Sequence, residues 1–398
     1  MSQKILVLEC YQHSLIVLRS LSRAGYQIVL GVTKQEMDEG FVHLSRHVSS
    51  TWMHPDITDD PAGFDRALVD FLNENPQIKL VYPVGENSVR KLTSVRAELP
   101  TDVMVAMPDN EAVESCLSKS SAGQVSERCK IPAPATRTVN STAELRETIH
   151  ELGFPAIVKP ADSRSTLLNK KCVFVRSGPD LEALAENWPE QGQNCVVQNE
   201  IVGLRHNCEF VAKDGQILQY FESEVIRTDE LDYSGNSVFH RSIAPNPLHR
   251  EYCERYTAEL NYTGIGLFQF FRDAKSGQSY FLEANPRTGA GIAIAVYCGI
   301  ELPALAVKAH TGDRIDPPIS YPLNKSVNWL NGDLLGLRRA LLRKEAGPRQ
   351  SLLWLGRLVA DFFRADCHTT FTWEDPKPTM YLYWGLLKRS LSKGERES

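Results

Sequence analysis

Acidic, amide and guanidinium side chains recur at alternate positions in the segment Gly264–Gly299. Two apolar, aromatic-rich runs in this segment flank the turn-forming residues Asp273–Gly277, which predicts an antiparallel hairpin. Glu283, Asn285 and Arg287 are two residues apart in the second run. A strand points residues with this spacing to one face, so we expect the three side chains to lie together.

Gln269 joins this group if the hairpin loop has an odd number of residues, because it then lies on the same face, nearly opposite Glu283. One carboxylate and two amide oxygens suit a hard cation such as Mg2+, which completes its octahedron with phosphate oxygens and water. Arg287 could hold a phosphoryl group beside that cation. Pro286 ends the strand, and Thr288–Gly291 leads into an apolar helix whose amides could face an anion. The alternative is a surface hairpin whose polar face is solvated.

Length and composition are those of a globular protein with two or three domains: 398 residues, of which 42% are hydrophobic. The net charge of -5 gives no reason to expect nucleic acid as a partner. The nine cysteines include no C-x-x-C pair, which indicates reduced thiols. Neither a signal peptide nor a run of about eighteen apolar residues occurs. We therefore expect a cytoplasmic, soluble protein, at most peripheral to a membrane.

The first part of the chain alternates strand and helix patterns, which predicts βαβ units. The expected strands and helices are Lys4–Leu8, Ser14–Ala24, Gln27–Val32, Ala62–Asn75 and Lys79–Pro83. The turn after the first strand lacks the G-x-G-x-x-G pattern, so a nicotinamide or flavin site is not expected there. Glu86 follows the last of these strands, at the edge of the sheet where α/β proteins place ligands. It could touch a substrate, or it could cap the next helix.

Lys159 ends an apolar strand, Phe154–Pro160. A lysine at the end of a buried strand is costly unless it meets an anion, and a nucleotide phosphate is a suitable one.

The sequence FLEANPRTGAG, which contains Glu283, Asn285 and Arg287, resembles the metal-binding E-x-N-P-R strand of the ATP-grasp superfamily. The preceding LFQFF resembles the version in carbamoyl-phosphate synthetase, where a Gln is the first metal ligand. The resemblance implies that Gln269, Glu283 and Asn285 bind Mg2+ or Mn2+, and that Arg287 and Lys159 act in catalysis with ATP.

The same resemblance assigns nucleotide contacts. Lys119, on an expected helix Glu111–Cys129, would contact the phosphates together with Lys159. The segment NCVVQNEI resembles the hinge strand of the family, which makes Glu200 and Ile201 the adenine contacts. Glu209, which opens the next expected strand EFVAKDGQIL, is a candidate for ribose or acceptor contact. Arg241 is a candidate for binding an acceptor carboxylate, although surface arginines are common.

One segment departs from the family. A Gly-rich flap normally follows the strand lysine and covers the phosphates with its amides. Here the stretch Ala161–Lys171 contains no glycine. Hydroxyl groups, Arg164 or the two lysines, Lys170 and Lys171, would have to do this work.

The expected fold class is α/β: a Rossmann-like pre-ATP-grasp domain, residues 1–110, is followed by a two-subdomain ATP-grasp fold (α+β), residues 111–317, which divides at about 195. Residues 318–398 would form a largely helical C-terminal extension. Lys325–Arg343 and Gln350–Asp366 have helical spacing. The tail Met380–Arg389 joins aromatic residues to a basic end, and such a helix can lie on an acidic membrane or dock on a partner. Packing on the protein itself is commoner, and we expect that here.

The implied function is an ADP-forming carboxylate–amine ligase that uses small-molecule substrates. A bicarbonate-phosphorylating enzyme, related to carbamoyl-phosphate synthetase or biotin carboxylase, is one alternative. A nucleotide-binding protein without catalysis is another, and the glycine-free flap supports it. The sequence leaves open a homodimer and a scaffolding or membrane-docking role of the C-terminal segment.

Overall fold

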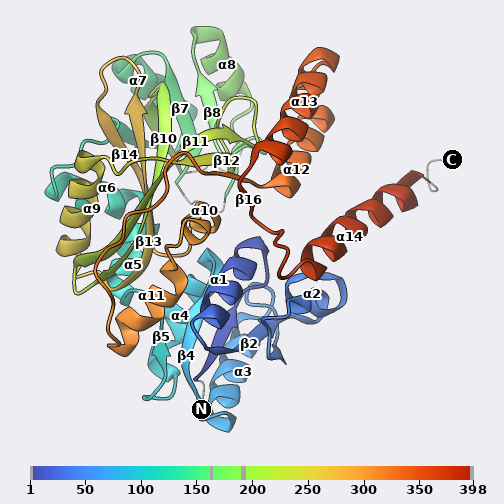
Figure 1. The fold of residues 1–398 in the computed structure, drawn as a ribbon. Helices are drawn as coiled ribbons and strands as arrows, with labels where there is room; N and C mark the ends of the chain where they lie inside the picture. The colour runs from blue at the N-terminus through green and yellow to red at the C-terminus, as the bar shows by residue number, and fades with distance from the viewer. Residues whose placement is uncertain (1–2, 162–164, 190–193, 395–398) are drawn as a thin grey trace.

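The computed structural model describes residues 3–161, 165–189 and 194–394, and these residues form three β-sheets with helices packed against them (Figure 1). The first sheet has five parallel strands in the order β3-β2-β1-β4-β5. Its strands are β1 Lys4–Leu8, β2 Gln27–Val32, β3 Ser50–Met53, β4 Ile78–Pro83 and β5 Met104–Val105. Its helices are α1 Gln12–Arg23, α2 Lys34–Glu39, α3 Pro61–Glu74, α4 Glu86–Val95 and the short 3-10 helices η1 Val42–Leu44 and η2 Arg96–Glu98.

The central strands of this sheet are apolar throughout because both faces are covered. Residues such as Leu6 and Phe64 form a core on the side of α3 and α4. The opposite face packs under α1, whose leucines join a larger core. The predicted βαβ pattern is therefore confirmed, with the ligand-accessible carboxyl ends of β1 and β4 side by side.

A four-stranded antiparallel sheet, in the order β6-β9-β7-β8, follows in the chain. Its elements are β6 Thr136–Val139, α7 Thr142–Leu152, β7 Ala156–Pro160, β8 Val173–Val175, α8 Gly178–Glu186 and β9 Cys195–Asn199. Before it come α5 Asn110–Leu117 and α6 Lys119–Arg128. The single helix predicted over Glu111–Cys129 is wrong. Ser118 has an extended backbone and caps α6 by accepting the Ser121 amide, so the helix breaks there.

The third sheet has seven strands in the order β14-β13-β10-β11-β12-β15-β16. Its strands are β10 Gly203–Lys213, β11 Gln216–Thr228, β12 Ser237–Ser242, β13 Gly264–Asp273, β14 Ser279–Asn285, β15 Ser326–Asn328 and β16 Cys367–His368. The remaining helices are α9 Pro247–Glu259, α10 Ile292–Tyr297, α11 Leu302–Thr311, α12 Leu330–Leu342, α13 Pro348–Arg364 and α14 Lys377–Gly394. All neighbouring strands are antiparallel except β15 and β16.

Two predictions about this region are wrong. Glu209 does not open a strand; it lies in the middle of β10, which already begins at Gly203. The helix predicted over Lys325–Arg343 is shorter, because Ser326–Asn328 pair with β12 as a strand before α12 begins. The segment after residue 317 thus contributes β15 and β16 to the sheet and is not helical throughout.

The parallel sheet is fixed to the seven-stranded sheet by a continuous core. Leu15 of α1 and Leu30 of β2 belong to the same buried cluster as Ile292 of α10, Val307 of α11 and Phe221 of β11. This packing holds the carboxyl ends of β1 and β4 against the loop after β14. No helix in the described part of the chain is both long and apolar enough to cross a membrane. The overall class is mixed α/β.

Candidate active site

The hairpin of β13 and β14 brings the predicted metal ligands together. Gln269 pairs with Glu283 and Leu267 with Asn285, so the expected register is confirmed. Asn285 donates through Nδ2 to Glu283 Oε1 at 2.9 Å, and Gln269 donates through Nε2 to Asn207 Oδ1 at 2.7 Å. Because both amides donate through nitrogen, both amide oxygens are left to act as ligands. A carboxylate with two amide oxygens is a donor set that fits Mg2+.

Strand β10 adds three side chains to the same face of the sheet. Asn207 pairs with Gln269, and Arg205 and Glu209 lie two residues to either side of it. Arg205 donates to Gly235 O and Ser237 Oγ, both at 3.0 Å. Burial lowers the pKa of Arg205, while the Glu283 carboxylate opposes this effect. The predicted oxygen ligands thus have a half-buried cation close by, Arg205, which sequence reasoning missed.

Lys159 approaches this group from the four-stranded sheet. It lies near the end of β7, and burial lowers its pKa, while Glu283 acts in the opposite direction. The electrostatic contact with Glu283 shows that the two sheets face each other at the hairpin. Lys119, at the first position of α6, donates to the carbonyl of Pro160, the residue after Lys159. Both predicted lysines therefore lie at the end of β7.

The predicted adenine contacts lie just beyond the end of β9. The amide of Glu200 donates to Pro155 O at 3.0 Å, and its carboxylate pairs with Arg176 at 3.0 Å. Ile201 is half-buried. This segment links the four-stranded sheet to β10, so it spans the two sheets that carry the lysines and the oxygen ligands.

Arg287 lies in a cavity of about 470 Å³ between the parallel sheet and the seven-stranded sheet. Glu9 and His13 follow β1, Glu86 follows β4, and His240 comes from β12. The position of Glu86 in this cavity is the predicted one, at the carboxyl end of a parallel strand; its carboxylate also pairs with Arg90 at 2.8 Å.

The cavity holds buried polar groups with unsatisfied hydrogen-bonding capacity. Among the described residues, Nδ1 of His13, Nδ1 of His240 and Nε of Arg287 have no partner. Burial lowers the pKa of each histidine to about 3, helped by Arg287 near His13 and by Arg205 near His240. Both rings are therefore neutral at pH 7 and can donate or accept a hydrogen bond.

Two predicted residues lie apart from this cavity. Arg241 points to the other face of β12 from His240 and pairs with Glu224 at 2.7 Å. Glu209 is buried beneath the loop that follows β14, where Gly289 and Gly291 approach its carboxylate. Burial raises the pKa of Glu209 to about 8, although the Gly291 amide opposes this. The loop expected to face an anion thus lies against a carboxyl of the protein itself.

The described part of the glycine-free flap contains a tight turn at residues 167–170, between β7 and β8. Leu168 and Asn169 both have positive φ angles, 52° and 61°, and Leu167 pairs with Lys170. Lys170 forms an ion pair with Glu345 at 2.7 Å, and Arg343 donates to Asn169 O at 2.8 Å. The flap is thereby attached to the segment between α12 and α13. The predicted phosphate contact Arg164 lies outside the described residues, as do Asp162 and Ser163.

Comparison with known proteins gives one family model and several similar sequences. The family model described as "ATP-grasp in the biosynthetic pathway with Ter operon" matches residues 225–332. The carbamoyl phosphate synthase large chain of Methanoculleus marisnigri is 24% identical over 267 residues, 61% of this chain and 24% of the relative. The C-terminal section of that large chain from Methanopyrus kandleri is 26% identical over 273 residues, 62% of this chain and 47% of the relative. This chain therefore spans between a quarter and a half of the length of these curated relatives.

Solved structures share the fold. The biotin carboxylase from Campylobacter jejuni has a TM-score of 0.65 at 17% identity, over 82% of this chain and 74% of that one. The N5-carboxyaminoimidazole synthetase from Staphylococcus aureus has a TM-score of 0.64 at 14% identity, over 81% and 80% of the two chains.

Proposed function

We propose, from the premise that this chain contains an ATP-grasp domain homologous to that of carbamoyl phosphate synthase large chains, that the protein is an ADP-forming carboxylate–amine ligase. A carboxylate oxygen attacks the γ-phosphorus of ATP and ADP leaves. The amine nitrogen then attacks the acyl carbon of the acyl phosphate, phosphate leaves, and the amine gives up a proton. Such chemistry depends on positioning and charge neutralisation more than on a covalent protein nucleophile.

The side chains divide between nucleotide and acceptor. Gln269, Glu283 and Asn285 would hold Mg2+ or Mn2+, which when bound neutralises phosphate charge. Lys159 and Lys119 would contact the phosphates. Their positions at the end of β7, opposite Glu283, support this assignment.

The backbone of Glu200 and Ile201 would contact adenine, since this segment joins the two sheets. Asn207 is better placed for the ribose than Glu209, because Asn207 lies beside Gln269 while Glu209 is covered by Gly289 and Gly291.

The acceptor substrates would occupy the cavity around Arg287. Its guanidinium can bind a carboxylate or the transferred phosphoryl group. Glu86 and Glu9 lie across the cavity, where an amine could be bound as a cation. The proposed domain limits at residues 110 and 317 place this cavity between the Rossmann-like and ATP-grasp domains. The structure gives Arg241 no part in it.

The observation that carries the proposal is the meeting of an oxygen-ligand group, Gln269, Glu283 and Asn285, with the half-buried cations Lys159 and Arg205. The test is ADP release by the purified protein with ATP and Mg2+, against pooled small carboxylates and amines. Glu283→Gln removes the charge of the ligand group at constant size. We expect ADP release to fall by roughly 10²–10³-fold or more, with an unchanged thermal unfolding midpoint.

Glu254→Gln is the matched control, because Glu254 is an exposed residue of α9 that pairs only with Arg250 among the described residues. It should leave ADP release unchanged. Substrate-dependent ADP release that survives in Glu283→Gln would refute the proposed metal site. The ligase assignment itself would be refuted if the wild type released no ADP with any pool of carboxylates and amines.

A bicarbonate-phosphorylating enzyme is the second candidate, and the likeness to carbamoyl phosphate synthase and biotin carboxylase favours it. Bicarbonate would then be the acid that accepts the phosphoryl group. ADP release that needs bicarbonate but no amine would select this function. ATP binding without ADP release in any mixture would instead favour the non-catalytic alternative.

A further inference from the structure

A buried cluster of side chains that can ligate a metal lies between the seven-stranded sheet and α9. His206 and Cys208 belong to β10, Glu222 belongs to the neighbouring strand β11, and His249 belongs to α9. Cys208 pairs directly with Glu222 in the strand register, and His206 points to the same face because it is two residues earlier. All four residues are at most 4% exposed. The candidate active site lies on the other face of this sheet, so the cluster is separate from it.

The potential ligand atoms of this cluster converge on one point. Nδ1 of His206 and Nδ1 of His249 lie 2.9 Å and 2.7 Å from Oε1 of Glu222, and one ligand atom from each of these residues lies within 4.8 Å of the others. The Cys208 thiol is in hydrogen-bonding contact with His249. Zinc bonds of about 2.0–2.3 Å place tetrahedral ligand atoms about 3.3–3.6 Å apart. A zinc ion therefore fits among these atoms once the two short contacts open by about half an ångström.

The remaining polar atoms of two of these side chains are held by other groups. Oε2 of Glu222 accepts from Tyr220 Oη at 2.9 Å and from the Asn246 amide at 2.8 Å. Nε2 of His249 lies 2.6 Å from Ser279 Oγ. Proteins orient metal-binding histidines and carboxylates by hydrogen bonds of this kind, made by the ring nitrogen or oxygen that does not bind the metal. Oε1 of Glu222 and Nδ1 of His249 are thus the atoms directed to the common point.

The chemistry of the four side chains selects the ion. Imidazole and thiolate ligands suit Zn2+, whereas Mg2+ and Ca2+ take oxygen ligands. Zn2+ with one thiolate and one carboxylate carries no net charge, so its burial leaves no uncompensated charge. Four protein ligands fill the tetrahedral positions, which is typical of a structural site and not of a catalytic one.

We propose that His206, Cys208, Glu222 and His249 bind one Zn2+ ion, which fixes α9 to β10 and β11. The Cys208 thiol releases its proton to solvent when the ion binds. Each neutral imidazole carries its proton on Nε2 and binds the ion through Nδ1, in place of the present hydrogen bond to Glu222. This site does not depend on the proposed ligase function.

The test begins with the metal content of the purified full chain, measured by plasma mass spectrometry. We expect one zinc per chain, and its removal by a chelator should lower the thermal unfolding midpoint. Co2+ added after the chelator should give the visible bands of a tetrahedral site and a thiolate-to-cobalt charge-transfer band in the near ultraviolet. Glu283→Gln, which changes the proposed Mg2+ site, should leave the zinc content and the cobalt spectrum unchanged.

Two substitutions within the cluster identify the ligands. Cys208→Ser should abolish the thiolate-to-cobalt band and weaken zinc binding by about 10-fold or more. Cys253→Ser is the matched control, because Cys253 is an equally buried thiol of α9 that is not one of the four proposed ligands. It should keep both the band and the zinc. His206→Gln covers the case in which Cys208→Ser does not fold, and it should lower the zinc content while the thiolate-to-cobalt band changes.

Two results would overturn the proposal. In the first, the wild type is purified with far less than one zinc per chain and takes up neither Zn2+ nor Co2+ in excess, so that the cluster is a hydrogen-bond network only. In the second, folded Cys208→Ser and His206→Gln hold zinc as tightly as the wild type and give its cobalt spectrum.

Discussion

Two buried glutamates, one on each face of the seven-stranded sheet, have pKa values shifted in opposite directions. On the face that carries Gln269 and Glu283, neither carboxylate oxygen of Glu209 has a close hydrogen-bond partner among the described residues. Burial therefore raises its pKa to about 8. Glu209 is thus a neutral, hydrogen-bond-capable group at pH 7, which suits support of the Gly289–Gly291 loop better than contact with a cationic or anionic substrate.

Glu209→Gln tests this state through the pH dependence of stability. Because the folded-state pKa lies above the ordinary value of 4.5, the folded protein retains a proton that the unfolded chain has lost. Stability from this group is full below about pH 4.5 and falls as the pH rises towards 8. Between pH 5 and pH 8, the wild type should lose on the order of 2–4 kcal/mol more than Glu209→Gln.

Urea unfolding at several pH values measures this difference, with Glu254→Gln as the exposed control. Equal losses in the wild type and Glu209→Gln would contradict a buried, protonated Glu209.

Glu222, on the opposite face, is buried but fully hydrogen-bonded. Its Oε1 accepts from Nδ1 of His206 at 2.9 Å and Nδ1 of His249 at 2.7 Å. Its Oε2 accepts from Tyr220 Oη at 2.9 Å and the Asn246 amide at 2.8 Å. Burial alone would raise the pKa of Glu222, but these hydrogen bonds outweigh it and lower the pKa to about 2. The four bonds saturate the carboxylate, and the proposed zinc ion would take the place of the two from histidine.

At the scale of elements, the loop after β14 packs against Glu209 of β10 and so ties the β13–β14 hairpin, which carries the predicted metal ligands, to its neighbouring strand. A Cβ added at Gly289 would lie 2.5 Å from Glu209 Oε1 and 2.7 Å from Leu267 Cδ2, closer than real contacts allow. Gly289→Ala should therefore destabilise the protein by about 1–3 kcal/mol. It should also reduce ADP release, because Gly289 follows the proposed ligand Asn285 by only four residues.

Gly123→Ala is the matched substitution, because nothing lies within 4 Å of a Cβ at Gly123 in α6. It should stabilise the protein by about 0.5–1 kcal/mol. Urea unfolding measures the free energy of unfolding of both variants. If Gly289→Ala is as stable as the wild type or more stable, the loop does not depend on the close contact of Gly289 with Glu209 and Leu267.

The sequence could predict elements whose pattern is local. The period of two through Glu283 and Asn285 set the face and register of the hairpin, and the structure has both. It could not predict β15, because three residues carry too little pattern and their partner strand, β12, lies more than eighty residues earlier. The break between α5 and α6 at Ser118 could not be predicted either, because the helical spacing of apolar residues continues across it.

The candidate site was predictable only in part for the same reason. Arg205, Asn207 and Glu209 alternate along β10, and this spacing was available in the sequence. The intervening His206 and Cys208 are buried on the other face, so polar and apolar residues do not alternate there and the strand was assigned too late in the chain. Glu9 and His13 reach the site from the end of β1, which only the packing of α1 against α10 explains.

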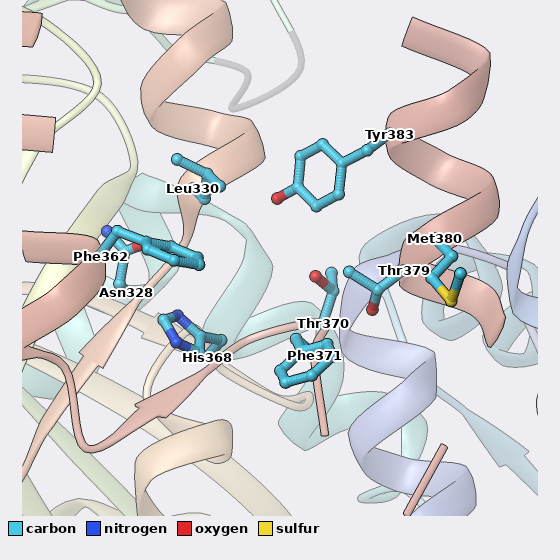
Figure 2. Close-up of a pocket in the computed structure, with 9 residues that line it drawn as sticks. All are labelled: Asn328, Leu330, Phe362, His368, Thr370, Phe371, Thr379, Met380 and Tyr383. Atoms are coloured by element: carbon cyan, nitrogen blue, oxygen red, sulfur yellow. The ribbon is translucent and has the colours of Figure 1, made fainter. Parts of the chain in front are cut away.

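At the scale of the whole molecule, the C-terminal segment is fixed to the first sheet by one buried ion pair. Asp375 accepts from Arg19 of α1 at 3.2 Å, from Ser45 Oγ at 2.6 Å and from the Arg46 amide at 3.0 Å. Arg19 also donates to Thr370 O at 2.9 Å. These partners are separated by more than 300 residues in the chain, so the contact joins the C-terminal segment to the N-terminal part of the protein. It places α14 beside a cavity of about 350 Å³ that Leu330, Phe362 and Tyr383 line (Figure 2).

Asp375→Asn should let the C-terminal segment, residues 371–388, detach from α1 part of the time. The substitution leaves the Arg19 charge buried without its counterion, which costs about 3–5 kcal/mol, and the segment can avoid that cost by detaching. Hydrogen exchange followed by mass spectrometry should show faster exchange in residues 371–388 and unchanged exchange in β1 and β4. Asp316→Asn, an exposed aspartate paired only loosely with Arg314, is the control.

The paired replacement Arg19→Met with Asp375→Leu separates the role of the charges from that of the packing. Two apolar side chains remove the buried charges and their desolvation cost, but Ser45 Oγ and the Arg46 amide lose their acceptor. This variant should therefore keep α14 in place with a stability about 1–3 kcal/mol below that of the wild type. The double variant should therefore exchange in residues 371–388 as the wild type does, while Asp375→Asn exchanges faster. Unchanged exchange in Asp375→Asn would mean that the apolar contacts of α14, and not the ion pair, hold the C-terminal segment.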